Sequence, residues 1–189
     1  MEYIGEHIII GTMGQAFITI AFTSAILAAY SFYKSSINET LKSEWLPLAR
    51  GSFYTHGIAV VGIIVCMFIM IYNHYFEYQY VWQHSSKSLP THYMISCFWE
   101  GQEGSFLLWI FWNIILGLLL IKTAKKWEGP VLTIVSAIQV FLSSMIIGIY
   151  VLGVKIGTSP FVLVRNLDEN LGLPWTQMEN YLQIVPQFM

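Results

Sequence analysis

The chain has 189 residues, of which 56% are hydrophobic, 16% aromatic and only 11% charged. Soluble proteins contain about 25% charged residues on average, and the mean hydropathy of this chain is +0.58. The composition therefore excludes a disordered chain and an ordinary cytosolic enzyme. A net charge of −2 supplies no basic field for nucleic acid. These properties indicate a polytopic membrane protein.

Four stretches are apolar over the length that a bilayer requires, which is about 20 residues. They cover approximately residues 8–32, 53–72, 105–121 and 130–152. Pro130 opens the last stretch, where the first turn of a helix tolerates proline. No alternation of polar and apolar residues is long enough to indicate a transmembrane barrel. The sequence therefore predicts an all-α fold with four transmembrane helices in one region.

The positions of Lys and Arg predict the orientation of these helices. The two segments that follow the first and third spans hold six basic and three acidic residues, or 6 − 3 = +3. The N-terminus, the loop 73–104 and the tail 153–189 hold three basic and eight acidic residues, or 3 − 8 = −5. Because basic loops stay in the cytoplasm, both termini and the loop 73–104 are predicted to face outward, into the periplasm.

The outer loop holds three of the five histidines, His74, His84 and His92, among many aromatic residues. One interpretation is an aromatic belt at the membrane interface, where histidine is an ordinary polar neighbour. The other is a platform for a flat apolar ligand, with histidine as an axial ligand or hydrogen-bond donor. The spacing by itself does not choose between them.

The other two histidines fall in different parts of the spans. His7 lies at the outer end of the first span and His56 near the inner end of the second, so they are poor candidates for the two axial ligands of one flat cofactor. An ionisable residue within a span suggests function, although a hydrogen bond between packed helices is the favoured interpretation of His56. Cys66 and Cys97 form no CxxC pair, and Cys66 is interpreted as a small buried residue, with a redox role for the two as the alternative.

The segment 93–109 carries the most specific pattern, YMISCFWEGQEGSFLLW. Gly101 and Gly104 are three residues apart and allow close backbone approach where a helix enters the membrane. Ser105 and Trp109 follow on one helical face. From the residues alone, the segment is predicted to be a tight turn with an aromatic anchor.

This segment resembles the Y-x-I-S-x-x-W-x-G-x-x-G-S-L-L-L-W stretch of the CcmF/CcyK/CcsA haem lyase family. The N-terminal MEYIGEHIII looks like the G-x-x-H start of the family in a Bacteroidetes-like form, and Thr158–Phe161 is similar to its S-N-P-F. The resemblance implies structural or partner-contact roles, and no identified catalytic role, for the motif residues Trp99, Gly101, Gly104, Ser105 and Trp109.

The chain also departs from the family pattern. Family members are much longer, and the tryptophan-rich haem motif W-G-x-W-W-x-W-D and its flanking histidines do not occur here. No haem ligand of the family can therefore be transferred. His7, His56 and His84 remain weak candidates for haem or polar contacts, and no metal site is predicted. The chain is expected to be an N-terminal fragment of a longer protein.

The resemblance implies cytochrome c-type biogenesis by a membrane haem lyase, with haem, apocytochrome c, other maturation subunits and membrane lipid as partners. It implies the bacterial inner membrane as the location, and the fragment is expected to be inactive alone. One alternative is a component of a transporter for haem or another solute, because Gln15 and Gln139 lie within spans. The absence of a mid-span Asp, Glu, Lys or Arg opposes that alternative. The other is a membrane scaffold without catalytic function.

Overall fold

The computed structural model describes residues 6–37, 39–87, 89–151 and 154–166. Four long helices cross the molecule side by side: α1 (Ile8–Ile37), α2 (Glu39–Tyr72), α5 (Gln102–Thr123) and α6 (Glu128–Ile147). All four are long and apolar enough to span a membrane. The fold is therefore helical with four apolar helices, and the chain is a membrane protein.

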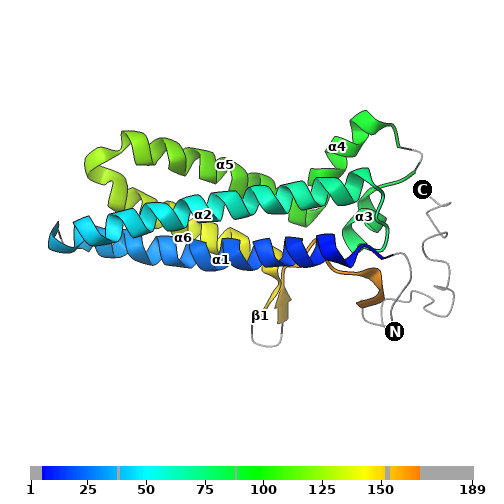
Figure 1. Ribbon diagram of the computed structural model, residues 1–189, viewed down its shortest axis with the longest axis horizontal. Helices are drawn as coiled ribbons and strands as arrows, with labels where there is room; N and C mark the ends of the chain where they lie inside the picture. The colour runs from blue at the N-terminus through cyan, green and yellow to red at the C-terminus, as the bar shows by residue number, and fades with distance from the viewer. Residues whose placement is uncertain (1–5, 38, 88, 152–153, 167–189) are drawn as a thin grey trace.

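The helices pack as an elongated bundle whose two ends differ (Figure 1). α1 packs against α2 and α6, and α5 packs against α6 and α2. One end carries the turns between α1 and α2 and between α5 and α6, with the short helix η1 (Lys125–Trp127) in the second turn. We call it the turn end. The opposite end carries α3 (Gln79–His84), α4 (Thr91–Glu100) and η2 (Val164–Asn166), and we call it the loop end.

Two clusters of buried side chains form the core. The larger one holds residues from all four long helices and from α3 and α4, including Met67, Leu107 and Ile146. The smaller one lies around Phe32 and Phe53. Many large apolar side chains point outward instead; Ile58, for example, is 72% exposed. Because such a surface is unfavourable in water, it indicates contact with lipid.

The second helix is longer than the predicted span. The span 53–72 is part of α2, which already begins at Glu39. The charged segment that the sequence assigned to a loop is therefore helical, with Pro47 inside it. Membrane helices tolerate such a proline because neighbouring groups can satisfy the freed carbonyl. The consequence is that Arg50 lies on a helix and faces α6 rather than a loop.

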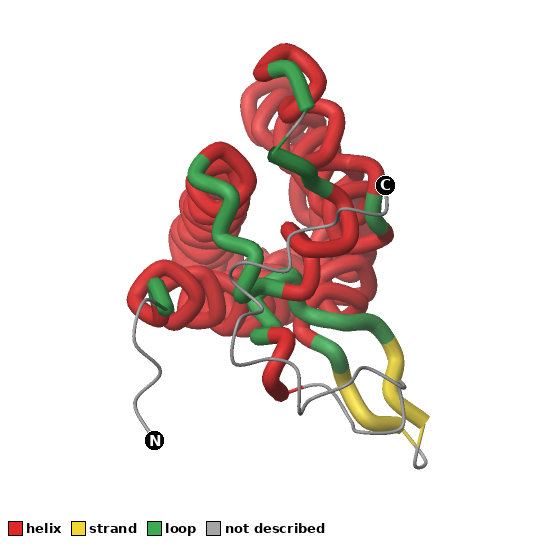
Figure 2. Tube along the Cα trace, turned by 90° about the vertical axis from the view of Figure 1, so that its right-hand side faces the viewer, coloured by secondary structure: helices red, strands yellow, loops and turns green. Residues whose placement is uncertain are grey.

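The predicted fourth span, 130–152, extends too far. α6 ends at Ile147, and Gly148 follows with φ of 72°, a left-handed conformation that favours glycine. The chain then forms a two-stranded antiparallel hairpin of β1 (Ile149–Val151) and β2 (Val154–Ile156). The hairpin projects from the side of the bundle (Figure 2). The all-α prediction holds for the bundle and misses this small sheet.

Candidate functional site

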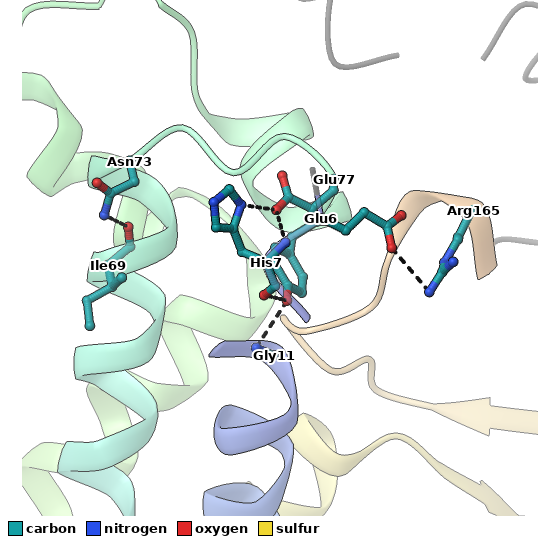
Figure 3. A network of polar contacts seen from close by, with 8 residues as sticks. Glu6, His7, Gly11, Ile69, Asn73, Glu77 and Arg165 are labelled. Carbon is teal, nitrogen blue, oxygen red and sulfur yellow. Dashed lines mark hydrogen bonds and ion pairs between the residues drawn. The ribbon is translucent and has the colours of Figure 1, made fainter. Parts of the chain in front are cut away.

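The loop end brings together four segments that are distant in sequence. Residues 77–79 pair with residues 162–164 through an isolated bridge between Tyr78 and Leu163. The Gln79 amide donates to the Val162 carbonyl at 2.9 Å, and the Val164 amide donates to the Glu77 carbonyl at 2.8 Å. The start of α1 lies beside this pairing (Figure 3). The outer-loop motif, residues 93–109, also lies at this end, and the loop end is therefore the candidate site.

A polar network fixes the start of α1 to the loop (Figure 3). The backbone amide of His7 donates to Glu77 Oε1 at 3.1 Å, and His7 Nδ1 lies 3.0 Å from the same oxygen. Nδ1 donates to this oxygen in the tautomer that carries its ring proton on Nδ1. The His7 ring also stacks on Tyr75, with 3.9 Å between ring centroids. Arg165 forms an ion pair with Glu6 at 3.2 Å, which attaches η2 to the same place.

Tyr78 is the buried centre of this network. Its hydroxyl donates to the His7 carbonyl at 2.8 Å and accepts from the Gly11 amide at 3.0 Å. The Gly11 amide belongs to the first turn of α1, where backbone N–H groups have no partner within the helix. A Cβ at Gly11 would lie 2.4 Å from the Tyr78 oxygen. A residue without a side chain is therefore needed here, because the ring approaches the helix backbone directly.

Tyr80 has a similar role under the motif. Its hydroxyl donates to the Phe98 carbonyl at 2.6 Å, with the Cys97 carbonyl at 3.1 Å, and it accepts from the Gly101 amide at 3.3 Å. Gly101 is the residue at which α4 ends and α5 begins. The Tyr80 hydroxyl therefore bonds to backbone groups on both sides of this break. Burial raises the pKa of the Tyr80 phenol above its usual value.

The two motif glycines lie where backbone and side chains approach most closely. A Cβ at Gly104 would lie 1.5 Å from the Phe98 carbonyl oxygen, and one at Gly101 would lie 2.6 Å from the Tyr80 ring. Ser105 donates its hydroxyl to the Trp99 carbonyl at 2.9 Å, across the same break. The motif thus holds α4 and α5 at a fixed angle.

The motif tryptophans point away from the core. Trp99 is 45% exposed and Trp109 is 60% exposed. Exposed tryptophan suits the membrane interface or a protein partner, because the ring is apolar and its N–H is polar. The motif therefore has an inner part that packs, around Gly101 and Gly104, and an outer part that is available for contact.

The three candidate histidines lie in separate surroundings. His84 packs against Tyr80, with 4.8 Å between ring centroids, and against Gly101. It is therefore next to the motif, whereas His7 belongs to the Glu77 network. His56 is fully buried among the long helices, and its Nδ1 lies 2.8 Å from the Ala21 carbonyl. A carbonyl only accepts, so Nδ1 donates, and His56 joins α2 to α1.

Among the described residues, none is identified as an axial ligand of haem. A groove of about 450 Å³ lies at the loop end, but none of its lining residues is His, Cys or Met: Ile8, Gly11, Thr12, Gln15, Ala16, Thr19, Tyr78, Phe161 and Leu163. No group of three or more His, Cys, Asp or Glu that could hold a metal exists among the described residues. His7 and His56 each use Nδ1 in a protein contact, and a role of any candidate histidine toward haem stays a prediction.

Sequence reasoning did not find the residues that organise this end. Glu77, Tyr78 and Tyr80 were treated only as members of an aromatic loop, because their partners are 17 to 71 residues away in the chain. Nothing in the local pattern signals such distant pairs. Cys66 and Cys97 are free and buried, and burial raises the pKa of the Cys97 thiol, which disfavours its reactive thiolate.

The Tyr78 hydroxyl is expected to stabilise the loop end. Tyr78→Phe would leave the Gly11 amide and the His7 carbonyl without this partner, at a cost of about 1–3 kcal/mol in the free energy of unfolding. Denaturant titration of the purified chain in detergent measures the change. Tyr93→Phe is the control, because Tyr93 is 55% exposed. Equal stability of both variants would show that the Tyr78 contacts contribute nothing.

Stability is also expected to fall in alkaline solution. Burial raises the pKa of Tyr78 from 10.0 to about 12. The folded state then keeps a proton that the unfolded state has lost, so the contribution of Tyr78 is fully present below pH 10 and declines as the pH approaches 12. Unfolding titrations across this range should give a steeper decline for the wild type than for Tyr78→Phe. Parallel curves would contradict this assignment.

Fold and site together define a polytopic helical membrane protein with a structured loop end. No protein-family model matches the chain. Among curated proteins, the cytochrome c-type biogenesis protein CcmF of Haemophilus influenzae is 31% identical over 98 residues, which cover 50% of this chain and 14% of that protein. The resemblance that the segment 93–109 indicates is confirmed at the level of sequence.

A solved structure agrees in fold. The structure described as cytochrome c heme lyase CcmF matches with a TM-score of 0.71 and 19% sequence identity. The match covers 88% of this chain and 27% of that one. The chain is thus CcmF-like in sequence over half of its length and in fold over most of it. It spans less than a third of the length of each of these two proteins.

Proposed function

We propose that this chain takes part in cytochrome c-type biogenesis, as one part of a membrane haem lyase that handles haem and helps to attach it to apocytochrome c. The observation that carries the proposal is the joint match of sequence and fold to proteins named CcmF. Haem chemistry in such an assembly comes from the haem itself, and the protein positions the reactants. Apocytochrome c and other maturation subunits are the partners that this role requires.

The contribution of this chain is to present the loop end. The Tyr78 hydroxyl bonds to two backbone groups at the start of α1, and the Tyr80 hydroxyl bonds to backbone groups on both sides of the break between α4 and α5. These contacts fix both places to the loop. Trp99 and Trp109 remain exposed beside that fixed frame. A rigid frame with exposed aromatic rings suits contact with a partner or a flat apolar ligand. Haem ligation is assigned to no residue described here.

The orientation follows from charge. We assign the turn end, with Lys122, Lys125 and Lys126, to the cytoplasm and the loop end to the periplasmic face of the inner membrane, because basic residues stay inside. A cysteine introduced at Ser86 or at Ser43 is the test. A thiol reagent that does not cross membranes should label the Ser86 variant from the periplasm and leave the Ser43 variant unlabelled.

The two alternative functions have less support. A transporter component would use polar residues within the spans, but Gln139 donates to the Ile110 carbonyl at 3.0 Å and so joins α6 to α5. A scaffold without catalytic function predicts no effect on cytochromes. The similarity to CcmF favours neither alternative.

The experiment measures covalent haem on c-type cytochromes in a bacterium from which the coding sequence has been deleted. Haem staining of denatured membranes should lose the cytochrome bands, and the wild-type sequence should restore them. A Trp99→Ala/Trp109→Ala variant should restore fewer, whereas the exposed Trp127 (70%) changed to Ala should restore all. Normal staining after deletion would refute the proposal. Immunoblots confirm that each variant is present in the membrane.

A further inference from the structure

Two buried polar side chains meet in the middle of the helix bundle, away from the candidate site. His56 lies near the middle of α2 and Gln139 near the middle of α6, and each is 0% exposed. The two side chains are close enough to interact. The Phe53 ring lies on the other side of the imidazole, with 6.3 Å between ring centroids. Polar groups this far from water are stable only if partners within the bundle satisfy them.

The imidazole of His56 has a defined hydrogen-bond direction at one of its nitrogens. Nδ1 lies 2.8 Å from the Ala21 carbonyl of α1, and a carbonyl only accepts, so Nδ1 carries a hydrogen. In the neutral ring the other nitrogen, Nε2, then holds a lone pair and can only accept. Nε2 is buried and has no hydrogen-bond partner among the described residues. The His56 ring therefore lacks one donor.

The side-chain amide of Gln139 is oriented in the same way. Its Nε2 donates to the Ile110 carbonyl of α5 at 3.0 Å. The reversed amide would place two oxygen atoms at that distance, so Oε1 is the end that remains. Oε1 is buried and, in the described part of the chain, has no hydrogen-bond partner. Two neighbouring side chains thus each keep an unused acceptor, and the donor that both need is missing.

A second proton on His56 would supply a donor, but it would create a buried cation. Such a charge is costly within a membrane unless an acid is paired with it. Glu128 is the buried acid on the same helix as Gln139, and it lies about 16 Å away along α6 at the rise of an α-helix. Arg50 already neutralises Glu128 through contacts of 2.6 and 2.7 Å. The surroundings therefore favour a neutral donor.

The same buried face of α6 carries two small hydroxyl side chains. Ser136 and Ser143 lie about one helical turn before and after Gln139, and they are 1% and 3% exposed. Their hydroxyl oxygens also have no hydrogen-bond partner within the part of the chain that the structure describes. A buried water typically makes about three hydrogen bonds. The two unused acceptors and one hydroxyl supply that number.

We propose that one water molecule binds between His56 and Gln139. It donates one hydrogen to His56 Nε2 and the other to Gln139 Oε1, and its oxygen accepts from a serine hydroxyl on the same face of α6. The water completes a series of hydrogen bonds from the Ala21 carbonyl of α1 to the Ile110 carbonyl of α5, across all four long helices. The site is independent of the proposed function in cytochrome c biogenesis.

NMR spectroscopy of the full chain in lipid nanodiscs, with nitrogen-15 in its histidines, tests the proposal. His56→Asn identifies the signals of His56 by their loss. The chemical shift of a ring nitrogen distinguishes a protonated nitrogen from one that accepts a hydrogen bond and from one with a free lone pair. We expect Nε2 to be unprotonated and to accept a hydrogen bond, with magnetisation transfer from water. A protonated Nε2 would overturn the proposal, and so would a free lone pair without transfer from water.

Gln139→Leu removes one of the two acceptors, so the transfer from water to His56 should be lost. Ser144→Ala is the matched control on the same helix, because the Ser144 hydroxyl donates to the Phe141 carbonyl at 2.6 Å and does not belong to the buried face. This variant should keep the full transfer. Equal transfer in the wild type and in Gln139→Leu would refute the site. Thermal unfolding shows whether each variant is folded, and the wild-type spectrum decides the proposal if Gln139→Leu is not.

Discussion

Gly104→Ala is expected to destabilise the protein more than a methyl group added at any other residue of the motif. The new Cβ would lie 1.5 Å from the Phe98 carbonyl oxygen and 2.6 Å from the Tyr80 hydroxyl. A backbone carbonyl cannot rotate away as a side chain can, so α4 and α5 must separate. The separation also strains the hydrogen bond from Tyr80 to Phe98. We expect the free energy of unfolding to fall by about 3 kcal/mol or more.

Gly51→Ala is the matched control for this experiment. Gly51 also lies within a long helix, but a Cβ there would meet nothing within 4 Å. Alanine in a helix interior is favoured over glycine by about 1 kcal/mol, so this variant should be neutral or more stable. Denaturant unfolding followed by circular dichroism in detergent compares the two. Similar stability of the Gly104 and Gly51 variants would contradict the close approach of Gly104 to Phe98.

Glu128→Gln is expected to have the second large effect. Arg50 Nε and Nη2 contact the two oxygens of Glu128 at 2.6 and 2.7 Å, a bidentate pair between α2 and α6. The Glu128 side chain is only 6% exposed, whereas that of Arg50 is 41% exposed. Removal of one partner from a fully buried pair costs about 3–5 kcal/mol. Because solvent screens the Arg50 side, we expect a loss of about 2–3 kcal/mol.

A double replacement separates the pair from its surroundings. Arg50→Met combined with Glu128→Leu leaves no unpaired charge, so this variant should recover most of the stability that Glu128→Gln loses. Glu44→Gln is the control, because Glu44 is exposed on the same helix as Arg50 and should change stability by less than about 0.5 kcal/mol. If the Glu128→Gln variant were as stable as the wild type, the pair would not be a stabilising link between α2 and α6.

The Arg50–Glu128 pair also shows what the sequence could not predict. Both residues were counted as charges in separate cytoplasmic loops, which gave a charge balance but no contact. Their pairing depends on the extension of α2 to Glu39 and on the start of α6 at Glu128. The residues are 78 positions apart, so no local pattern connects them. Only the packing of α1 against both α2 and α6 brings these charges together.

The sequence likewise predicted one part of the candidate site and missed another. The sequence indicated the motif, because two glycines before a tryptophan-rich apolar run are recognisable as a pattern. It did not indicate Tyr78 or Tyr80, whose hydroxyls act on backbone groups elsewhere in the chain. Tyrosine in an aromatic loop has the same local appearance whether its hydroxyl faces water or a buried amide. The difference depends on burial, which is a property of the folded chain.

The sequence by itself determined that this is a four-helix membrane protein similar to CcmF, since hydrophobic length and the motif of residues 93–109 are local properties. The bilayer requires about 20 apolar residues per span whatever the packing, so composition was sufficient for the class. The tertiary structure decided where the helices begin and end, that Arg50 meets Glu128, and that two tyrosines fix the loop end. These features depend on contacts between segments that are distant in the chain. The free energy of such a contact depends on burial, because a polar group removed from water must find a partner within the protein.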